Sequence, residues 1–189
     1  MDLCCTENVI ALGLIVGCFG MLSIVESETS PPPGLAAGDV LPVLKGEFLT
    51  GRTAILPGAA SGRVALLLLG FSYDSRLAVE AWAKRFRARF GKEPKVAFYE
   101  IPMIGGMARM GKWFIDSGMR RGTPKADHEN VITVYGGTDP WKERLRFKDP
   151  KAAHLILLDQ SGRVVFLWAG RFDEQAFEEL SGHVARLVK

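Results

Sequence analysis

Cysteine is missing from most of this sequence. The three cysteines, Cys4, Cys5 and Cys18, lie near the start of the 189 residues, and residues 31–189 contain none. That part of the chain therefore has no disulfide, no thiolate metal site and no thiol nucleophile. Internal repeats and low-complexity tracts are also lacking. With 48% hydrophobic and 24% charged residues, the composition is that of a globular protein with a sizeable core.

Basic residues are missing from the first 30 positions. Four of the 21 acidic residues lie there but none of the 24 basic ones, so residues 31–189 carry seven more basic than acidic side chains. A basic domain favours anionic lipid headgroups or an acidic partner, although a merely solvated basic surface explains the excess equally well. The basic clusters lack a nucleic-acid motif, so we expect no nucleic-acid partner.

Charge is absent altogether from residues 9–25. As a helix, this run would extend about 26 Å, a little less than the ~30 Å hydrocarbon core of a bilayer. A retained membrane anchor is the first interpretation. A signal cleaved near Ser27 and a lipoprotein signal lipidated on Cys18 are the alternatives. A buried helix of a soluble protein is disfavoured by the polar, proline-rich stretch that follows.

These features predict three parts in the chain. Residues 1–27 form a signal or anchor, residues 28–37 a proline-rich tether, and residues 38–189 a folded domain. The domain is expected at a membrane, held there through residues 9–25, on the non-cytoplasmic side.

The folded part alternates apolar runs with amphipathic stretches. Residues 64–70 read as a central strand buried on both faces, because the run is continuously apolar. A helix follows, with Val79, Trp82 and Phe86 on one stripe, and then a second strand that should lie parallel to the first. Shorter strands are predicted before this unit, and a hairpin and a helix capped by Asp173 are predicted after it. The order is β-α-β, an insertion over residues 102–152, and then β-β-α.

This α/β order, together with "GDVLP" at residues 38–42 and "LILLDQSGRVVFLWAG" near the end, resembles the thioredoxin-like superfamily, in particular its peroxiredoxin and thiol-reductase branch. The resemblance implies that the redox cysteines of that branch would fall at Ser72, Tyr73, Asp74, Ser75 and Arg76. Because none of these five residues is a cysteine, we expect that the protein is not an enzyme and has no thiol–disulfide or peroxidase activity. We expect Ser72, Asp74 and Ser75 to satisfy free amides at the helix start instead.

Within the superfamily, Trp82-x-x-x-Phe86, "FYEIP", Trp113 and Leu157-Leu158-Asp159 followed by Gly162-Arg163-Val164 resemble the Atp-ten family of ATP synthase assembly chaperones. This resemblance implies a redox-inactive protein without a cofactor that acts by binding another protein, one associated with a membrane.

The insertion offers a candidate binding face. Met103, Met107, Met110 and Phe114 recur at helical spacing, and methionine-rich surfaces adapt to varied apolar partners. We predict that Met107, Met110, Trp113, Arg120 and Arg121 contact the partner. The alternative is that the stripe packs on the sheet as ordinary core.

Two other kinds of site are considered. An enzyme with a non-thiol site near Tyr73–Arg76 is the alternative function, because the start of that helix is where the superfamily places its chemistry. A metal site at Asp127-His128-Glu129 is disfavoured, since three adjacent residues do not easily point at one ion. No metal or other cofactor is expected.

Overall fold

The computed structural model describes residues 34–189, without the side chains of residues 107–109. The predictions for the anchor, the cleavage near Ser27, the lipidation of Cys18 and most of the tether lie outside these residues. Within residues 34–189, no helix is both long enough and apolar enough to cross a membrane.

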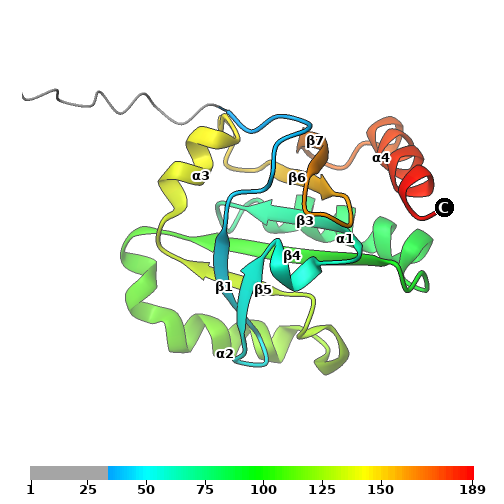
Figure 1. The fold of residues 1–189 in the computed structure, drawn as a ribbon. Coiled ribbons are helices and arrows are strands. Elements are labelled where there is room, and N and C mark those ends of the chain that lie inside the picture. The colour runs from blue at the N-terminus through cyan, green and yellow to red at the C-terminus, as the bar shows by residue number, and fades with distance from the viewer. Residues whose placement is uncertain (1–33) are drawn as a thin grey trace, which may run out of the picture. The chain divides into compact units, whose positions relative to one another are not determined.

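Strands and helices alternate along most of the described chain (Figure 1). The strands are β1 (Leu44–Phe48), β2 (Thr53–Leu56), β3 (Val64–Gly70), β4 (Val96–Ile104), β5 (Ile132–Tyr135), β6 (Ala153–Leu158) and β7 (Val164–Gly170). The α-helices are α1 (Arg76–Phe90), α2 (Lys112–Gly122), α3 (Thr138–Arg144) and α4 (Glu174–Leu187). Short 3-10 turns are η1 (Gly58–Ala60), η2 (Gly106–Gly111) and η3 (Lys125–Asp127).

The strands form one sheet in the order β2-β1-β5-β4-β3-β6-β7. β3 pairs with β4 in parallel and with β6 antiparallel, so the predicted β-α-β unit and the β6–β7 hairpin are both confirmed. The turn between β6 and β7 uses Gly162 at a positive φ, which glycine adopts without steric cost. The final helix begins as predicted, because the Asp173 side chain accepts a hydrogen bond from the Ala176 amide at 2.8 Å.

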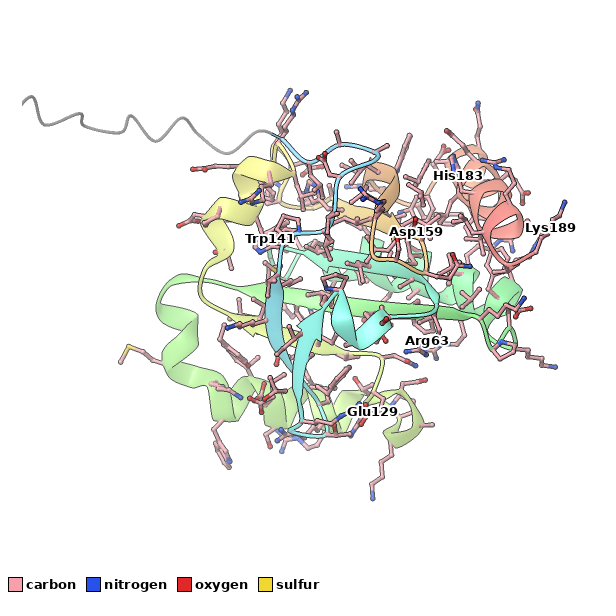
Figure 2. The ribbon with its side chains drawn as sticks, in the orientation of Figure 1. Arg63, Glu129, Trp141, Asp159, His183 and Lys189 are labelled. Atoms are coloured by element: carbon pink, nitrogen blue, oxygen red, sulfur yellow. The ribbon has the colours of Figure 1, made fainter. Side chains whose placement is uncertain are left out.

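Apolar side chains are buried on both faces of the sheet. On one face, α1 and α4 cover Leu66 and Leu68 of β3. On the other, Leu67 and Leu69 pack with residues of β1, β2 and α3, among them Trp141, which points toward the sheet (Figure 2). The alternation along β3 explains why this strand reads as a continuous apolar run, since both of its faces are covered.

The insertion differs from its prediction in one respect. β4 continues through Pro102 to Ile104, so Met103 is a buried strand residue rather than the first position of a helical stripe. The prediction of a helical stripe of methionines is therefore wrong at Met103. The later part of the insertion does contain a helix, α2, and the extra strand β5.

Trp82 offers a direct test of the α1–α4 core. Its side chain is fully buried, and its ring lies 5.1 Å from the Phe172 ring. We expect Trp82→Ala to lower the free energy of unfolding by about 3–5 kcal/mol, because it removes a large buried ring and leaves a cavity. Leu77→Ala, a truncation on the exposed side of the same helix, should change it by less than about 0.5 kcal/mol. Chemical denaturation measures both; similar losses would contradict this packing.

Candidate functional site

The turn between β3 and α1 is built around two serines. Ser75 is buried, and its Oγ donates to the Ser72 carbonyl at 2.7 Å, while the Ser75 amide donates to Ser72 Oγ at 3.2 Å. Ser72 Oγ also donates to the Pro150 carbonyl, which joins the turn to the loop before β6. Ser72 thus satisfies one amide at the helix start, as expected, whereas the N-cap residue Ser75 makes no side-chain capping bond.

Gly70 makes this turn possible. An added Cβ at Gly70 would lie 2.6 Å from Ser75 Oγ, so only glycine leaves room for the buried hydroxyl. The Ser75 hydroxyl donates to a carbonyl and not to a base, so this arrangement does not activate it as a nucleophile.

His154 lies beside this turn, at the start of β6. It pairs with Leu69 across the β3–β6 ladder, and its ring contacts those of Phe71 and Phe147, with centroids 5.4 and 5.8 Å away. Its Nε2 is buried without a hydrogen-bond partner in the described structure. Burial lowers the pKa of His154 because the charged imidazolium would lose its hydration.

A groove of about 570 Å³ opens next to the same turn. Tyr73 and Leu77, 81% and 70% exposed, lie along it, and Arg76 stacks over the Tyr73 ring at 5.3 Å. Cationic side chains from three segments line the groove, against one acid, Asp74. These are Arg76, Lys151 and Arg171. We call it the α1 groove.

The helix α2 is attached to the sheet by polar contacts. Asp116 is buried and accepts hydrogen bonds from Tyr135 Oη and Lys112 Nζ, each at 2.6 Å. Lys112 also pairs with Glu47 of β1 at 3.2 Å, and Arg120 Nε donates to the Leu49 carbonyl at 2.7 Å. Burial, followed by the Asp116 hydrogen bond, raises the pKa of Tyr135 far above its usual value. The inner side of this helix is therefore held to the sheet by polar contacts, beside the half-buried Ile115 and Met119.

The outer side of α2, together with Met110 just before it in η2, exposes large apolar side chains. Met110, Trp113 and Phe114 are 86%, 79% and 71% exposed, and Arg121 is exposed at the end of the helix. We call Met110, Trp113, Phe114 and Arg121 the α2 face. The structure thus groups three of the predicted site residues, whereas Arg120 turns back toward the sheet and the Met107 side chain is not described. Phe114 belongs to the face, although the sequence analysis did not select it as a site residue.

The three adjacent polar residues after α2 turn to three different partners. Asp127 pairs with Arg87 at 2.9 Å, His128 Nε2 lies 3.0 Å from the Thr123 carbonyl, and Glu129 pairs with Arg52. Across residues 34–189, no group of His, Cys, Asp and Glu side chains is arranged to hold a metal ion.

Glu100 of β4 has the most unusual carboxyl among the described groups. Burial raises its pKa to about 7, with the positive charge of Arg87 opposing that rise and the negative charges of Glu80 and Asp127 adding to it. Strongly shifted carboxyls mark functional sites in many enzymes, but Glu100 lines neither the α1 groove nor the α2 face.

Comparison with solved structures identifies the architecture. The thioredoxin domain of a thiol–disulfide oxidoreductase from Bacteroides vulgatus matches at a TM-score of 0.53 and 21% identity, covering 80% of this chain and 99% of that one. A thiol–disulfide oxidoreductase from Bacteroides fragilis matches at 0.53 and 15%, covering 76% and 98%. A thiol peroxidase from Chromobacterium violaceum matches at 0.51 and 16%, covering 79% and 88%. This chain has a thioredoxin-like fold. No protein-family model and no curated protein matches the sequence.

The comparison corrects one expectation. The prediction that this protein is not an enzyme, with no thiol–disulfide or peroxidase activity, is wrong, because chains of the same fold are thiol–disulfide oxidoreductases and a thiol peroxidase. The described turn has serines at 72 and 75, and the chain's cysteines all lie in residues 1–33.

The fit between Gly70 and Ser75 can be measured by a double-mutant cycle. We expect Gly70→Ala to cost about 1–3 kcal/mol by overpacking, and Ser75→Ala to cost about 1–2 kcal/mol through its lost hydrogen bonds. Because Ser75→Ala removes the oxygen that the new methyl would meet, the double variant should cost less than the sum, by about 0.5 kcal/mol or more. Strict additivity would show that the two residues are not in contact.

His154 predicts a pH dependence of stability. Its folded pKa is lowered from about 6.5, so the unfolded chain takes up the proton first. Stability is therefore lost as pH falls through the unfolded value toward the folded one, and regained as pH rises. We expect the unfolding free energy of the wild type to drop more steeply between pH 7.5 and 5 than that of His154→Gln. Parallel pH profiles in denaturant titrations would contradict the burial of a neutral imidazole.

Proposed function

We propose that this protein acts by binding another protein through the α2 face, as an assembly factor or chaperone for a membrane complex. The observation that carries the proposal is the exposure of two aromatic side chains, Trp113 and Phe114, on one helix. A surface helix normally turns its apolar side to the core and its polar side to water. Here the buried side carries Asp116, and the exposed side carries Trp113 and Phe114.

The energetic argument follows from the exposed rings. An aromatic side chain buries ~150–250 Å² when covered, and apolar surface removed from water contributes roughly 25 cal/mol per Å². Covering Trp113, Phe114 and Met110 would therefore stabilise a complex by several kcal/mol. Tryptophan and arginine are also the residues on which protein interfaces most often depend, which fits the combination of Trp113 with Arg121.

The scaffold suits this role. The Asp116–Tyr135 hydrogen bond fixes α2 against β5 and the Lys112–Glu47 ion pair fixes it against β1, so the face is held in one orientation before a partner arrives. A surface presented on a rigid element loses little conformational entropy on binding.

Two features of the sequence support a location and a kind of partner. Residues 9–25 would hold the domain at a membrane, on its non-cytoplasmic side. The resemblance to the Atp-ten family supports a partner among the subunits of a membrane complex such as ATP synthase.

A second candidate is an enzyme with a non-thiol site at the α1 groove. One observation favours it: Arg76, Lys151 and Arg171 converge on a groove at the helix start, where an anionic substrate would be attracted. We rank it below protein binding because the Ser75 hydroxyl is not placed against a base.

Crosslinking and capture from native membranes tests the proposal. We expect the Trp113→Ala/Phe114→Ala double variant of the full chain to keep the stability of the wild type within about 0.5 kcal/mol, since both rings are already in water. Capture of the wild-type partner, identified by mass spectrometry, should fall at least tenfold.

Tyr73→Ala/Leu77→Ala is the matched control, because it removes a similarly exposed aromatic–aliphatic pair from the α1 groove. It should leave capture unchanged. Capture that is retained by the α2 variant but lost by the control would overturn the proposal and favour the α1 groove.

A further inference from the structure

The first half of β4 has an open edge. β4 pairs with β3 along its length, but it pairs with β5 only at Met103 and Ile104, with one isolated bridge from Glu100 to Val131. Residues 96–99 therefore have a strand on one side only, and Figure 1 shows β4 extending beyond the start of β5. Because β4 is a central strand of the sheet, the opening lies between β4 and the segment before β5 and not at an outer edge of the sheet. We call this opening, beside residues 96–99, the wedge.

The hydrogen bonds show which groups face the wedge. The Val64 amide donates to the Lys95 carbonyl at 2.9 Å, whereas the Glu100 amide donates away from β3, to the Asn130 carbonyl at 2.8 Å. Because the direction alternates along a strand, Ala97 and Tyr99 turn their backbone groups to β3, and Phe98 turns its groups to the wedge. Among the described residues, neither the amide nor the carbonyl of Phe98 has a partner strand there.

A groove of about 730 Å³ occupies the wedge. Its walls come from both faces of the sheet, with Phe48 on one face and the half-buried Phe90 on the other. A strand added beside Phe98 would point alternate side chains toward these two walls, because successive side chains of a strand lie on opposite faces. We call this space the β4 groove.

The charged side chains that line the β4 groove carry a net positive charge. Arg52 pairs with Glu129 at one side of the groove, which leaves that pair neutral. Arg63 pairs with no described carboxylate; its Nη2 donates to Tyr99 Oη at 2.8 Å, and Tyr99 Oη donates to the Ala59 carbonyl at 3.1 Å. Arg63 and Glu129 thus flank the groove from the segments before β3 and β5 (Figure 2). The net charge of its lining is positive, and the position of the unpaired guanidinium is fixed by a buried tyrosine.

We propose that the β4 groove binds an extended acidic peptide segment of a partner protein. The peptide adds a strand to β4 at Phe98 and places a carboxylate on Arg63. The backbone of Phe98 supplies the strand pairing, the apolar walls take alternate side chains, and Arg63 supplies the preference for acid. This site is separate from the α2 face and does not depend on the proposed function.

Peptide selection followed by amide hydrogen exchange tests the inference. Displayed random heptapeptides are selected on the full chain, and the enriched peptides are synthesised as probes. We expect acidic sequences rich in strand-forming residues. Their binding should slow exchange of the Phe98 amide. The Ala97 and Tyr99 amides, which face β3, should exchange slowly with or without peptide.

Variants of single residues test whether probe binding depends on the charge of Arg63. Arg63→Met keeps the apolar stem and removes the guanidinium, and it should weaken the probes about tenfold or more, as loss of a charge-assisted hydrogen bond does. Arg89→Met, which removes an exposed cation from α1, should bind like the wild type. The Trp113→Ala/Phe114→Ala variant should also bind the probes unchanged, so failure of this inference and failure of the proposed function are distinguishable.

Three outcomes would overturn the inference. The first is a selection that enriches no acidic peptide, and the second is probe binding that leaves exchange of the Phe98 amide unchanged. The third is slow exchange at Phe98 in the full chain without any peptide, since the edge would then already be filled by this chain itself.

Discussion

The burial of β3 on both faces is the constraint on which the rest of the structure depends. Every residue from Val64 to Gly70 is buried, and the strand pairs with β4 on one side and with β6 on the other. Alternate side chains enter the two cores, so neither core is complete without this strand. Because its end is fixed so firmly, the turn that follows at Ser72–Ser75 has a fixed position too.

That fixed end brings together groups from distant parts of the chain. Phe71 leaves β3, His154 enters β6 beside it, and Phe147 comes from the loop between α3 and β6. Ser72 adds the bond to Pro150. The described residues supply an aromatic cluster around the buried His154, whose pKa burial lowers, and a cationic groove outside it.

The elements that the sequence predicted well are those with one clear local signal in the sequence. β3, α1, β6, β7 and α4 follow from an unbroken apolar run, a helical stripe or a capped helix start, because each signal lies within a few neighbouring residues. The polarity of α2 could not be predicted in this way. Asp116 is buried only because Tyr135 and Lys112 satisfy its carboxylate, and Tyr135 reaches it from a strand that lies beyond the helix in the sequence. The opening beside Phe98 could not be predicted from the sequence either, because it depends on where β5 begins and not on any property of β4.

The way α2 is attached has a consequence for how this protein can change over evolution. Its outer side chains contribute little to folding, because the helix is held by polar contacts on its opposite side. Trp113 and Phe114 can therefore be exchanged without loss of the fold, and each exchange alters only what the surface recognises. Related chains with this architecture would keep residues equivalent to Asp116 and Tyr135 while their outer residues diverge with their partners. Along this one helix, the inner positions would then vary little between related chains and the outer positions would vary widely, because only the outer positions follow the partner.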